Sequence, residues 1–595
     1  MKRPIRVLSF LALLVGVAAL GAGAGQAQLA RNPFGLTVVR FAKGTTPDAM
    51  RTAVASAGGK VVVDLSRIGA LAVVPSSKDF AARIGADARV RAAFQDERVY
   101  DVAGPDGPRA LPHGRDRGQF TGDDFDDDDG PSSFVPPDPL HDAASFWGVT
   151  NPEGILQWDD NRMDVPAAWK RTTGSRSVRV AVLDSGVQAS HKEIRPNLDG
   201  DASANMIPCR ELIRELGRQA LIDAGLWDCS NRDTDGHGTW VASRIAGAAN
   251  GFGSNGVAPN VQLISYKVLA TGFGGLPSWI VAAMLDACSR HVDLLNMSIV
   301  GYLSPDDPFD VEDYLLFADA VDYCRAQGTT VFAAAGNEHV RINRVNLTIG
   351  GRALTGVGQV DTGADGFANM APGGSEALDL RGLLEVPAGV PGVVMVSATN
   401  NAIGDAPASV ALRWKQHVGA RDQLAYYSSY GSRVDLAAPG GARRFNIPSY
   451  DGGPDDILYG GWGSLGALSR RGEICTDPSL ASPQTFACFT LGSAAFGWLQ
   501  GTSMSSPNAT GVAALLLSAH SELRGNPSGV LSRLQATARR NMTNFMGGND
   551  GSNFAPAFDG SPCATAYCHV VQDRPVAFAD AYGAGLVDAA AAVAR

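Results

Sequence analysis

Short apolar runs alternate with Ala-rich segments along the chain from residue 157 onward. The clearest runs cover residues 178–183, 261–269, 293–299, 329–335 and 393–398. Continuous apolar runs of this length predict strands of a parallel sheet that is buried on both faces, and the segments between them predict the covering helices. We therefore expect an α/β fold with a mostly parallel twisted sheet, helices on both faces, and functional sites at the carboxyl ends of the strands.

A smaller pattern precedes this region, within residues 28–100. Strand-like runs at 36–41, 60–63 and 70–74 are separated by helix-like segments, the first of which begins near Thr46. This order predicts a small, independent α+β domain.

The start of the chain has the pattern of a secretory signal peptide. Three basic residues lie among the first six, an apolar run covers 7–22, and small residues follow as far as Ala27. The apolar run is short for a membrane-spanning helix. We therefore expect residues 1–27 to direct export, to the extracellular space or the periplasm, and we disfavour the alternative of an uncleaved membrane anchor.

Residues 101–150 differ in character from both neighbours. Pro and Gly are frequent, and residues 123–129 form the acidic run DDFDDDD. Such a segment buries too little apolar surface to order itself, so it predicts a linker before a large domain at 151–595. Calcium binding by the acidic run is an alternative, but the ligand spacing of an EF-hand is missing, and we favour a solvated charge run.

The composition excludes one class of partner and indicates disulfide bonds. The 595 residues carry a formal net charge of −10, so no overall basic field attracts phosphate backbones and nucleic acid is not an expected partner. Eight Cys residues, an even number in an exported chain, predict disulfides rather than a zinc site. The sequence leaves their connectivity open, and we prefer sequential pairing because it closes short loops.

Two candidate chemical residues occupy positions where a side chain can be presented to a substrate. Asp184 follows the apolar run 178–183, and His237 lies between Gly236 and Gly238 at the start of an Ala-rich segment. Taken singly, Asp184 would be a turn-capping residue and His237 a structural or surface residue. A neutral imidazole is, however, the best general base near neutral pH.

Ser503 and Asn337 also stand at predicted element ends. Ser503 lies in GTSMSSP, before the apolar run 511–517, which predicts the start of a buried helix that tolerates Pro507 within its first turn. Asn337 follows the apolar run 331–336. Alone, Ser503 could be an N-cap and Asn337 a turn residue. A helix start and a side-chain amide can both donate hydrogen bonds to an oxyanion.

Taken together, Asp184, His237, Asn337 and Ser503, in this order and with these neighbours, resemble the subtilase family of serine peptidases. The resemblance implies that Ser503 is the nucleophile, His237 its general base and later acid, and Asp184 the carboxylate that orients the imidazole. Asn337 and the backbone N–H of Ser503 would form the oxyanion hole. The implied activity is that of a secreted serine endopeptidase, which cleaves proteins through an acyl-enzyme without a cofactor in the chemistry.

The resemblance also implies a substrate-binding region. One wall, which pairs with the main chain of an extended peptide, is formed by Ser298, Ile299, Val300 and Gly301, and the opposite wall of the pocket for the residue before the cleaved bond by Ala334, Ala335 and Gly336. The family commonly has Gly where Val300 stands, so we expect a narrower pocket and carry over no side-chain preference. A buried strand is an equally valid description of the first wall.

Three further positions, close to the catalytic residues, depart from the family pattern, and none of them is a member of the triad. Trp240, Ser243 and Asn508 stand where His, Gly and His are frequent. They leave the subfamily open. Three stretches that a compact member lacks, residues 203–231, 340–391 and 440–498, are expected to shape substrate access or stability.

The resemblance covers residues 158 to the C-terminus, where 583–590 resemble the family's closing segment. Residues 28–100 resemble, more weakly, the family's inhibitory propeptide, a ferredoxin-like α+β domain that blocks the cleft until it is cut off. The cut could fall anywhere from about Tyr100 through the linker. The family commonly holds structural calcium, for which no ligands can be named, and we expect a monomer that is made as a self-processed zymogen.

Rival interpretations fit less well. Residues 251–256 match GxGxxG but follow a predicted helix and precede a strand, the reverse of a dinucleotide site. An α/β-hydrolase esterase would need GxSxG and the order Ser, acid, His, and the segment around Ser503 meets neither condition. A binding protein that keeps the fold without activity is the alternative from another class, and the presence of all four chemical residues argues against it.

Overall fold

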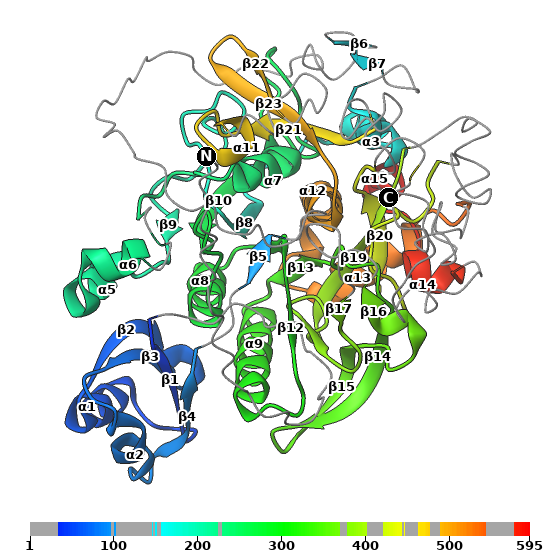
Figure 1. Ribbon diagram of the computed structural model, residues 1–595. Coiled ribbons are helices and arrows are strands. Elements are labelled where there is room, and N and C mark those ends of the chain that lie inside the picture. Colours follow the sequence, from blue (N-terminus) through cyan, green and yellow to red (C-terminus); the bar gives the residue numbers. More distant parts are fainter. Residues whose placement is uncertain are drawn as a thin grey trace, which may run out of the picture.

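The computed structural model describes residues 34–96, 100–102, 145–146, 149–150, 156–223, 226, 229–368, 378–401, 421–442, 446, 462–476, 488–542 and 576–595. The predicted signal peptide and most of the predicted linker lie outside these residues. The proposed division of the chain at residues 27, 100 and 150 therefore stays a prediction. Figure 1 shows a small N-terminal domain, in blue, beside a much larger domain.

The N-terminal domain is a single antiparallel sheet with two helices. In chain order its elements are β1 (Thr37–Phe41), α1 (Pro47–Ala57), β2 (Gly59–Leu65), η1 (Ser66–Ile68), β3 (Ala70–Pro75), α2 (Phe80–Gly85) and β4 (Val90–Gln95). The strand order is β2-β3-β1-β4. The three strands expected from the apolar runs are present, and β4 is an additional strand that the sequence pattern did not predict.

Local sequence explains the bounds of α1. Thr46 adopts an extended N-cap conformation and its side chain accepts a hydrogen bond from the N–H of Ala49 at 3.3 Å. Pro47 supplies the first helical residue, where no N–H is needed. Gly58 ends the helix at a φ of 83°, a left-handed conformation that favours glycine. Apolar residues of α1 and α2 then pack on one face of the sheet.

The large domain is built around a seven-stranded parallel sheet with the order β20-β19-β13-β11-β8-β10-β9. The strands are β8 (Arg179–Asp184), β9 (Ala204–Asn205), β10 (Gln262–Lys267), β11 (Leu294–Met297), β13 (Thr330–Ala334), β19 (Val393–Thr399) and β20 (Leu436–Pro439). All pairs between them are parallel. Each of the five apolar runs predicted as strands contributes one of these strands, so the predicted α/β class is confirmed.

Helices cover both faces of this sheet (Figure 1). One face carries α4 (Val165–Trp169), α7 (His237–Ala246), α12 (Thr502–Ala519), α13 (Pro527–Thr537) and α15 (Ala589–Val593), and the other carries α8 (Pro277–Ser289) and α9 (Pro308–Ala326). Alternation along β8 feeds both cores, because Val180 and Val182 pack with the first group while Ala181 and Leu183 pack with the second.

The predicted insertions form elements of their own. Residues 203–231 contain β9, α5 (Cys209–Leu216) and α6 (Arg218–Asp223); residues 340–391 contain β14 (Ile342–Ile349), β15 (Arg352–Val360), η2 (Ala364–Gly366), β16 (Phe367–Ala368), β17 (Leu378–Asp379) and β18 (Leu384–Val386); residues 440–498 contain β21 (Ser464–Leu468), α11 (Glu473–Thr476), β22 (Phe489–Leu491) and most of β23 (Ala494–Leu499). Strands β14, β15 and β18 continue through β12 (Ile299–Leu303) to β5 (Asp101–Val102) in one five-stranded sheet. Short elements complete the described chain: β6 (Ser145–Phe146), β7 (Val149–Thr150), α3 (Trp158–Arg162), η4 (Ser521–Leu523) and α14 (Phe578–Tyr582).

Three disulfides join sequential Cys residues, as preferred from the sequence. The pairs are Cys209–Cys229, Cys288–Cys324 and Cys475–Cys488. The remaining two Cys residues lie outside the described residues. The described helices include none that combines the length and the apolar character that a membrane crossing requires.

Candidate active site

The four chemical residues predicted from the sequence lie at the ends of core elements. Asp184 is the last residue of β8, His237 the first residue of α7, and Ser503 the second residue of α12. Asn337 follows the end of β13 by three residues. Strands β8 and β13 both pair with β11. Their carboxyl ends therefore lie at the same edge of the sheet, where α7 and α12 begin.

Asp184 and His237 form a buried pair. The Nδ1 atom of His237 lies 2.8 Å from Oδ1 of Asp184, and the two side chains are only 5% and 1% exposed. The same Oδ1 accepts a second hydrogen bond from the N–H of Ser185 at 2.8 Å. Among the described residues no group bonds Nε2 of His237, although that atom is buried. The imidazole is thus oriented through Nδ1, and Nε2 is left for a proton transfer.

The pKa of His237 reflects two opposing effects. Burial is the largest single effect and lowers the pKa, because it disfavours the imidazolium. The charge and hydrogen bond of Asp184, together with the charges of Asp235 and Asp233, outweigh burial and raise the pKa of His237 above 6.5. An imidazolium at His237 is therefore stabilised by these carboxylates.

Ser503 and Asn337 meet at the N-terminus of α12. The Oδ1 atom of Asn337 accepts hydrogen bonds from the backbone N–H of Thr502 at 2.8 Å and from its hydroxyl at 3.0 Å. These two donors fix the orientation of the amide. Its Nδ2 is buried without a hydrogen-bond partner among the described residues. A donor held in this way beside a helix N-terminus is suited to a developing negative charge on oxygen.

Pro507 corrects one expectation. The helix begins at Thr502, so Pro507 is its sixth residue and lies beyond the first turn, inside the helix. Proline has no N–H to donate to the carbonyl four residues earlier, which belongs to Ser503. The hydroxyl of Ser298 takes over this bond, donating to the Ser503 carbonyl oxygen at 2.8 Å, while Oγ of Ser503 lies 3.4 Å from the Ser298 carbonyl oxygen. A side chain from the sheet edge thus replaces the missing helix bond.

The first predicted substrate wall is occupied by the chain's own N-terminal region. Ser298 is buried before β12, and β12 contains Ile299, Val300 and Gly301. Strand β5 pairs with it antiparallel, Val102 opposite Ile299 and Asp101 opposite Val300. On the other side, Tyr100 and Gly275 exchange backbone hydrogen bonds of 2.7 Å. An extended segment is therefore held between two chain edges, as a bound peptide would be.

The second predicted wall lies against the helix that carries Ser503. Ala334 and Ala335 are fully buried at the end of β13, and the N–H of Gly336 donates to the Thr502 hydroxyl at 3.2 Å. Gly336 has a φ of 96°, and an added Cβ there would lie 2.6 Å from the Glu338 carboxylate. The positive φ favours glycine at this position, and any larger residue would also displace the end of the Glu338 side chain.

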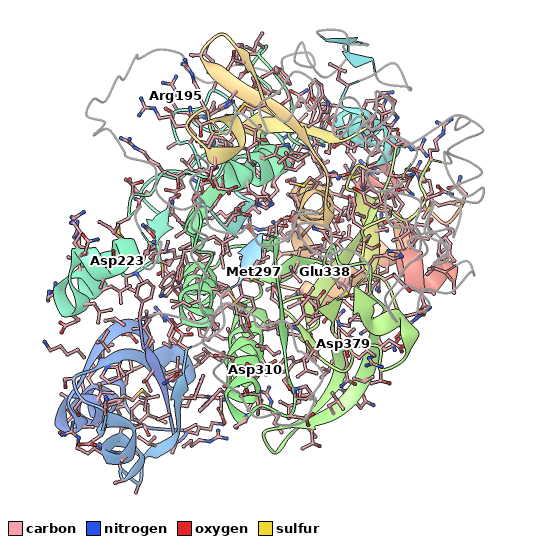
Figure 2. All side chains as sticks on the ribbon, viewed as in Figure 1. Arg195, Asp223, Met297, Asp310, Glu338 and Asp379 are labelled. Carbon is pink, nitrogen blue, oxygen red and sulfur yellow. A yellow bond between two sulfur atoms is a disulfide. The ribbon has the colours of Figure 1, made fainter. Side chains whose placement is uncertain are left out.

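A bond between Tyr302 and Glu338 links the two walls, and the sequence did not predict it. The hydroxyl of Tyr302, on β12, donates to Glu338 at 2.6 Å. Burial raises the pKa of the Glu338 carboxyl. Figure 2 shows Glu338 near the middle of the molecule, not far in the view from Met297, the last residue of β11. Its place directly after Asn337 is the one sequence signal that could have identified it.

The departures from the family pattern match the insertion that covers α7. The indole Nε1 of Trp240 donates to the Gly497 carbonyl at 3.2 Å, and the hydroxyl of Ser243 accepts from the N–H of Ala467 at 2.9 Å. Both partners belong to the sheet of β21 and β23. Asn508 accepts bonds from the buried guanidinium of Arg244 at 3.2 and 3.0 Å. Trp240 and Ser243 thus adapt α7 to this chain's own insertion, whereas Asn508 joins α12 to α7.

Within the described ranges, no group of three or more His, Cys, Asp or Glu side chains is arranged to hold a metal ion. The predicted calcium ion therefore gains no ligand set of this kind and stays a prediction.

Comparison with known sequences identifies a family. Residues 175–555 match the sequence model of the Subtilase family. The chain is 34% identical over 176 residues to an intracellular serine protease of Paenibacillus polymyxa, a match that covers 30% of this chain and 46%, about half, of that relative. It is 26% identical over 397 residues to subtilisin E of Bacillus subtilis, covering 66% of this chain and 68% of that protein.

A solved structure supports the fold over nearly the whole chain. The epidermin leader peptide processing serine protease of Staphylococcus aureus aligns with a TM-score of 0.57 and 15% identity. The alignment covers 94% of this chain and 97% of that one. At this identity the likeness shows the fold alone.

Proposed function

The chain belongs to the subtilase family, and from this premise we propose that it is a secreted serine endopeptidase, made as a self-processed precursor, whose catalytic triad is Asp184, His237 and Ser503. The observation that carries the proposal is the buried His237–Asp184 hydrogen bond of 2.8 Å, which leaves Nε2 of His237 without a bond among the described residues. Ser503 stands at the start of α12, a helix that contacts α7. A core histidine of purely structural function generally has both ring nitrogens satisfied.

The proposed reaction begins with attack of Ser503 Oγ on the carbonyl carbon of the cleaved peptide bond. Nε2 of His237 takes the hydroxyl proton, and Asp184 stabilises the imidazolium through Nδ1. His237 then gives the proton to the leaving amine, and an acyl-enzyme remains on Ser503. Water deprotonated by the same imidazole hydrolyses the ester and restores the free hydroxyl.

Two donors would stabilise the tetrahedral intermediates. Nδ2 of Asn337 is the donor left over after Thr502 has engaged the amide oxygen, and the backbone N–H of Ser503 lies in the first turn of α12. N–H groups of a first turn have no partner within the helix. Both donors are held before the reaction begins, so the developing oxyanion meets a site that needs no reorganisation.

Protein and peptide substrates are proposed to bind as an extended strand between β12 and Gly275. Main-chain pairing of this kind binds peptides irrespective of most side chains. Residues 100–102 of the chain itself support this binding mode, because they pair with β12 on one side and with Gly275 on the other, where the substrate strand is proposed to lie.

The N-terminal domain is proposed to be the inhibitory propeptide. Its contacts with the large domain support this role. Asp96 is buried and accepts bonds from the hydroxyl and N–H of Ser278, at the start of α8, at 2.6 and 3.3 Å. Arg40 pairs with Glu312 at 2.7 Å and also with Asp319, both on α9. These contacts would hold residues 100–102 in the substrate channel until they are displaced.

The test is expression of the precursor and of its Ser503→Ala variant, with N-terminal processing and casein hydrolysis followed together. We expect the wild-type protein to lose its N-terminal domain and digest casein, and the variant to do neither, because loss of a triad nucleophile costs about 10⁶ in kcat. If both proteins behave alike, Ser503 is not the nucleophile, and a binding protein on the same fold becomes the better explanation.

A further inference from the structure

A second carboxylate, that of Asp233, lies beside the Asp184–His237 pair and is only 1% exposed. Its Oδ1 accepts hydrogen bonds from the N–H groups of Asp235 at 3.1 Å and Gly236 at 2.8 Å. Its Oδ2 accepts from Thr239, at 2.9 Å from the N–H and 2.6 Å from the hydroxyl. These bonds draw the residues before and after His237 onto a single side chain.

The same carboxylate is connected to the residue after Asp184. The hydroxyl of Ser185 donates to Oδ1 of Asp233 at 2.9 Å and accepts from the N–H of Gly238 at 2.9 Å. The N–H of Ser185 in turn donates to Oδ1 of Asp184, the atom that faces His237. Ser185 is thus the link that sets the end of β8 at a fixed distance from the start of α7.

All three leading N–H groups of α7 are bonded by this network. The N–H of His237 donates to the Asp235 carboxylate at 3.0 Å. The N–H of Gly238 donates to the Ser185 hydroxyl at 2.9 Å, and the N–H of Thr239 donates to the Asp233 carboxylate at 2.9 Å. The residue at the N-cap position, Gly236, contributes no side chain of its own. A helix start depends on such partners, and here they also determine where the imidazole stands.

The insertion around β21 and β23 holds the opposite side of the same loop. Three backbone carbonyls of the loop accept hydrogen bonds from this insertion. The Ser469 hydroxyl donates to the Asp233 carbonyl at 2.6 Å, the Glu473 N–H to that of Thr234 at 2.9 Å, and the Ile474 N–H to that of Asp235 at 3.0 Å. We name residues 462–476 and 488–499 the buttress segment. Figure 1 shows its strands and α11 next to α7, and the Cys475–Cys488 disulfide joins its two parts.

We propose that Asp233 is a positioning residue for the His237–Asp184 pair, and that the buttress segment keeps the loop of Asp233 in the conformation this requires. The carboxylate acts through the peptide N–H groups it binds and through Ser185, and it touches no substrate. This inference rests on the proposed peptidase function. It assigns the buttress segment a role in catalysis, because that segment holds the loop before α7 from the side of the helix that faces away from the sheet.

The charge of Asp233 gives the position a second measurable effect. Its negative charge raises the pKa of His237, while burial, followed by the charge of Asp235, raises the pKa of Asp233 itself to about 6. Other charged groups on the packed elements are Asp184 on β8, Lys267 on β10, Arg232 beside the loop and Glu473 on α11. If these other groups keep their charges, removal of the Asp233 charge should therefore lower the pKa of His237.

The experiment compares the mature wild-type enzyme with Asp233→Asn. An amide replaces one acceptor oxygen with a donor, so either the bonds to Oδ1 or those to Oδ2 are lost whichever way it turns. We expect kcat per titrated active site to fall by up to about 100-fold, the effect of a displacement on the order of 1 Å, with KM changed by less than about threefold. The acid limb of the kcat/KM profile should move to lower pH. Active-site titration with a serine-directed phosphonate counts only folded, reactive molecules.

A matched pair of disulfide variants tests the buttress segment. Cys475→Ala/Cys488→Ala removes the disulfide of this segment, whereas Cys288→Ala/Cys324→Ala removes a disulfide between α8 and α9, on the other face of the sheet. Both variants should melt at lower temperature. Only the first should lose kcat per titrated site, and Ser469→Ala should lose kcat in the same direction without removing any disulfide.

Each outcome decides between explanations. If wild-type enzyme is not acylated by the phosphonate, the peptidase function fails and this inference fails with it. If wild-type enzyme is acylated but Asp233→Asn keeps both its kcat per site and its acid limb, Asp233 is only structural. If the two disulfide variants lose kcat equally, or neither does, the buttress segment has no specific part in positioning His237.

Discussion

The substitution Asp184→Asn removes one charge from the candidate active site while the side chain keeps its shape. The N–H of Ser185 donates to Oδ1 of Asp184, so the oxygen of the new amide should remain at that position and its NH₂ group should take the place of Oδ2. His237 Nδ1 would still meet an oxygen, as it does in the 2.8 Å bond to Asp184. The change is therefore mainly electrostatic.

The expected loss follows from the missing charge. The imidazolium formed during attack by Ser503 would lose the carboxylate that stabilises it in a buried site, where charge interactions are weakly screened. Loss of a triad carboxylate lowers kcat by about 10⁴, which corresponds to about 5.4 kcal/mol at 1.36 kcal/mol for each factor of ten. Because Asp184 raises the pKa of His237, the acid limb of activity should also move to lower pH.

The assay measures kcat and KM on a peptide p-nitroanilide across the acid limb, with the N-terminal domain removed at an engineered site in the linker. Asp379→Asn is the control, since Asp379 lies in an insertion, where it is paired with Arg381 at 2.8 Å. A loss in kcat of less than about tenfold, or an unmoved acid limb, would refute the assignment of Asp184.

Three further predictions concern other parts of the molecule. Asn337→Leu should lower kcat by about 10²–10³ with little change in KM, because it removes an oxyanion donor; equal changes in both constants would contradict this. Arg40→Ala should weaken binding of the cleaved N-terminal domain by about 1–3 kcal/mol and shorten the lag between processing and activity, since partly buried pairs with Glu312 and Asp319 are broken; an unchanged lag would count against the propeptide assignment. His191 is buried, and burial lowers its pKa to about 4 from 6.5, so the unfolded chain binds the extra proton and stability is lost as pH falls from about 6.5 through about 4. In urea unfolding of the Ser503→Ala protein, His191→Gln should reduce this loss by up to about 3 kcal/mol, and an identical pH dependence would disprove it.

Much of the framework follows from sequence patterns that act over short distances. Every residue of the run 178–183 except Arg179 is apolar. Both faces of β8 can therefore pack against a layer of helices. Asp184 ends that run, and a site at the carboxyl edge follows from the parallel sheet. Loop length favours sequential disulfide pairing, and three such pairs are present.

The contacts that the sequence did not predict join residues far apart in the chain. Tyr302 and Glu338 meet because β12 and the segment after β13 end side by side, and no local pattern carries that register. The prediction for Pro507 is wrong because composition alone does not fix the start of α12. In the sequence Asp233 resembles any other loop acid, and only its five hydrogen bonds in the structure distinguish it from a solvated residue.

The most direct test of the account is to locate the covalent adduct of a serine-directed fluorophosphonate on the processed enzyme by peptide mass spectrometry. We expect a single adduct on Ser503, at a rate that falls as His237 becomes protonated, and no adduct in the His237→Ala protein on the same time scale. An adduct on another residue, or none on correctly processed and folded protein, would contradict the assignment of Ser503 as a nucleophile activated by His237.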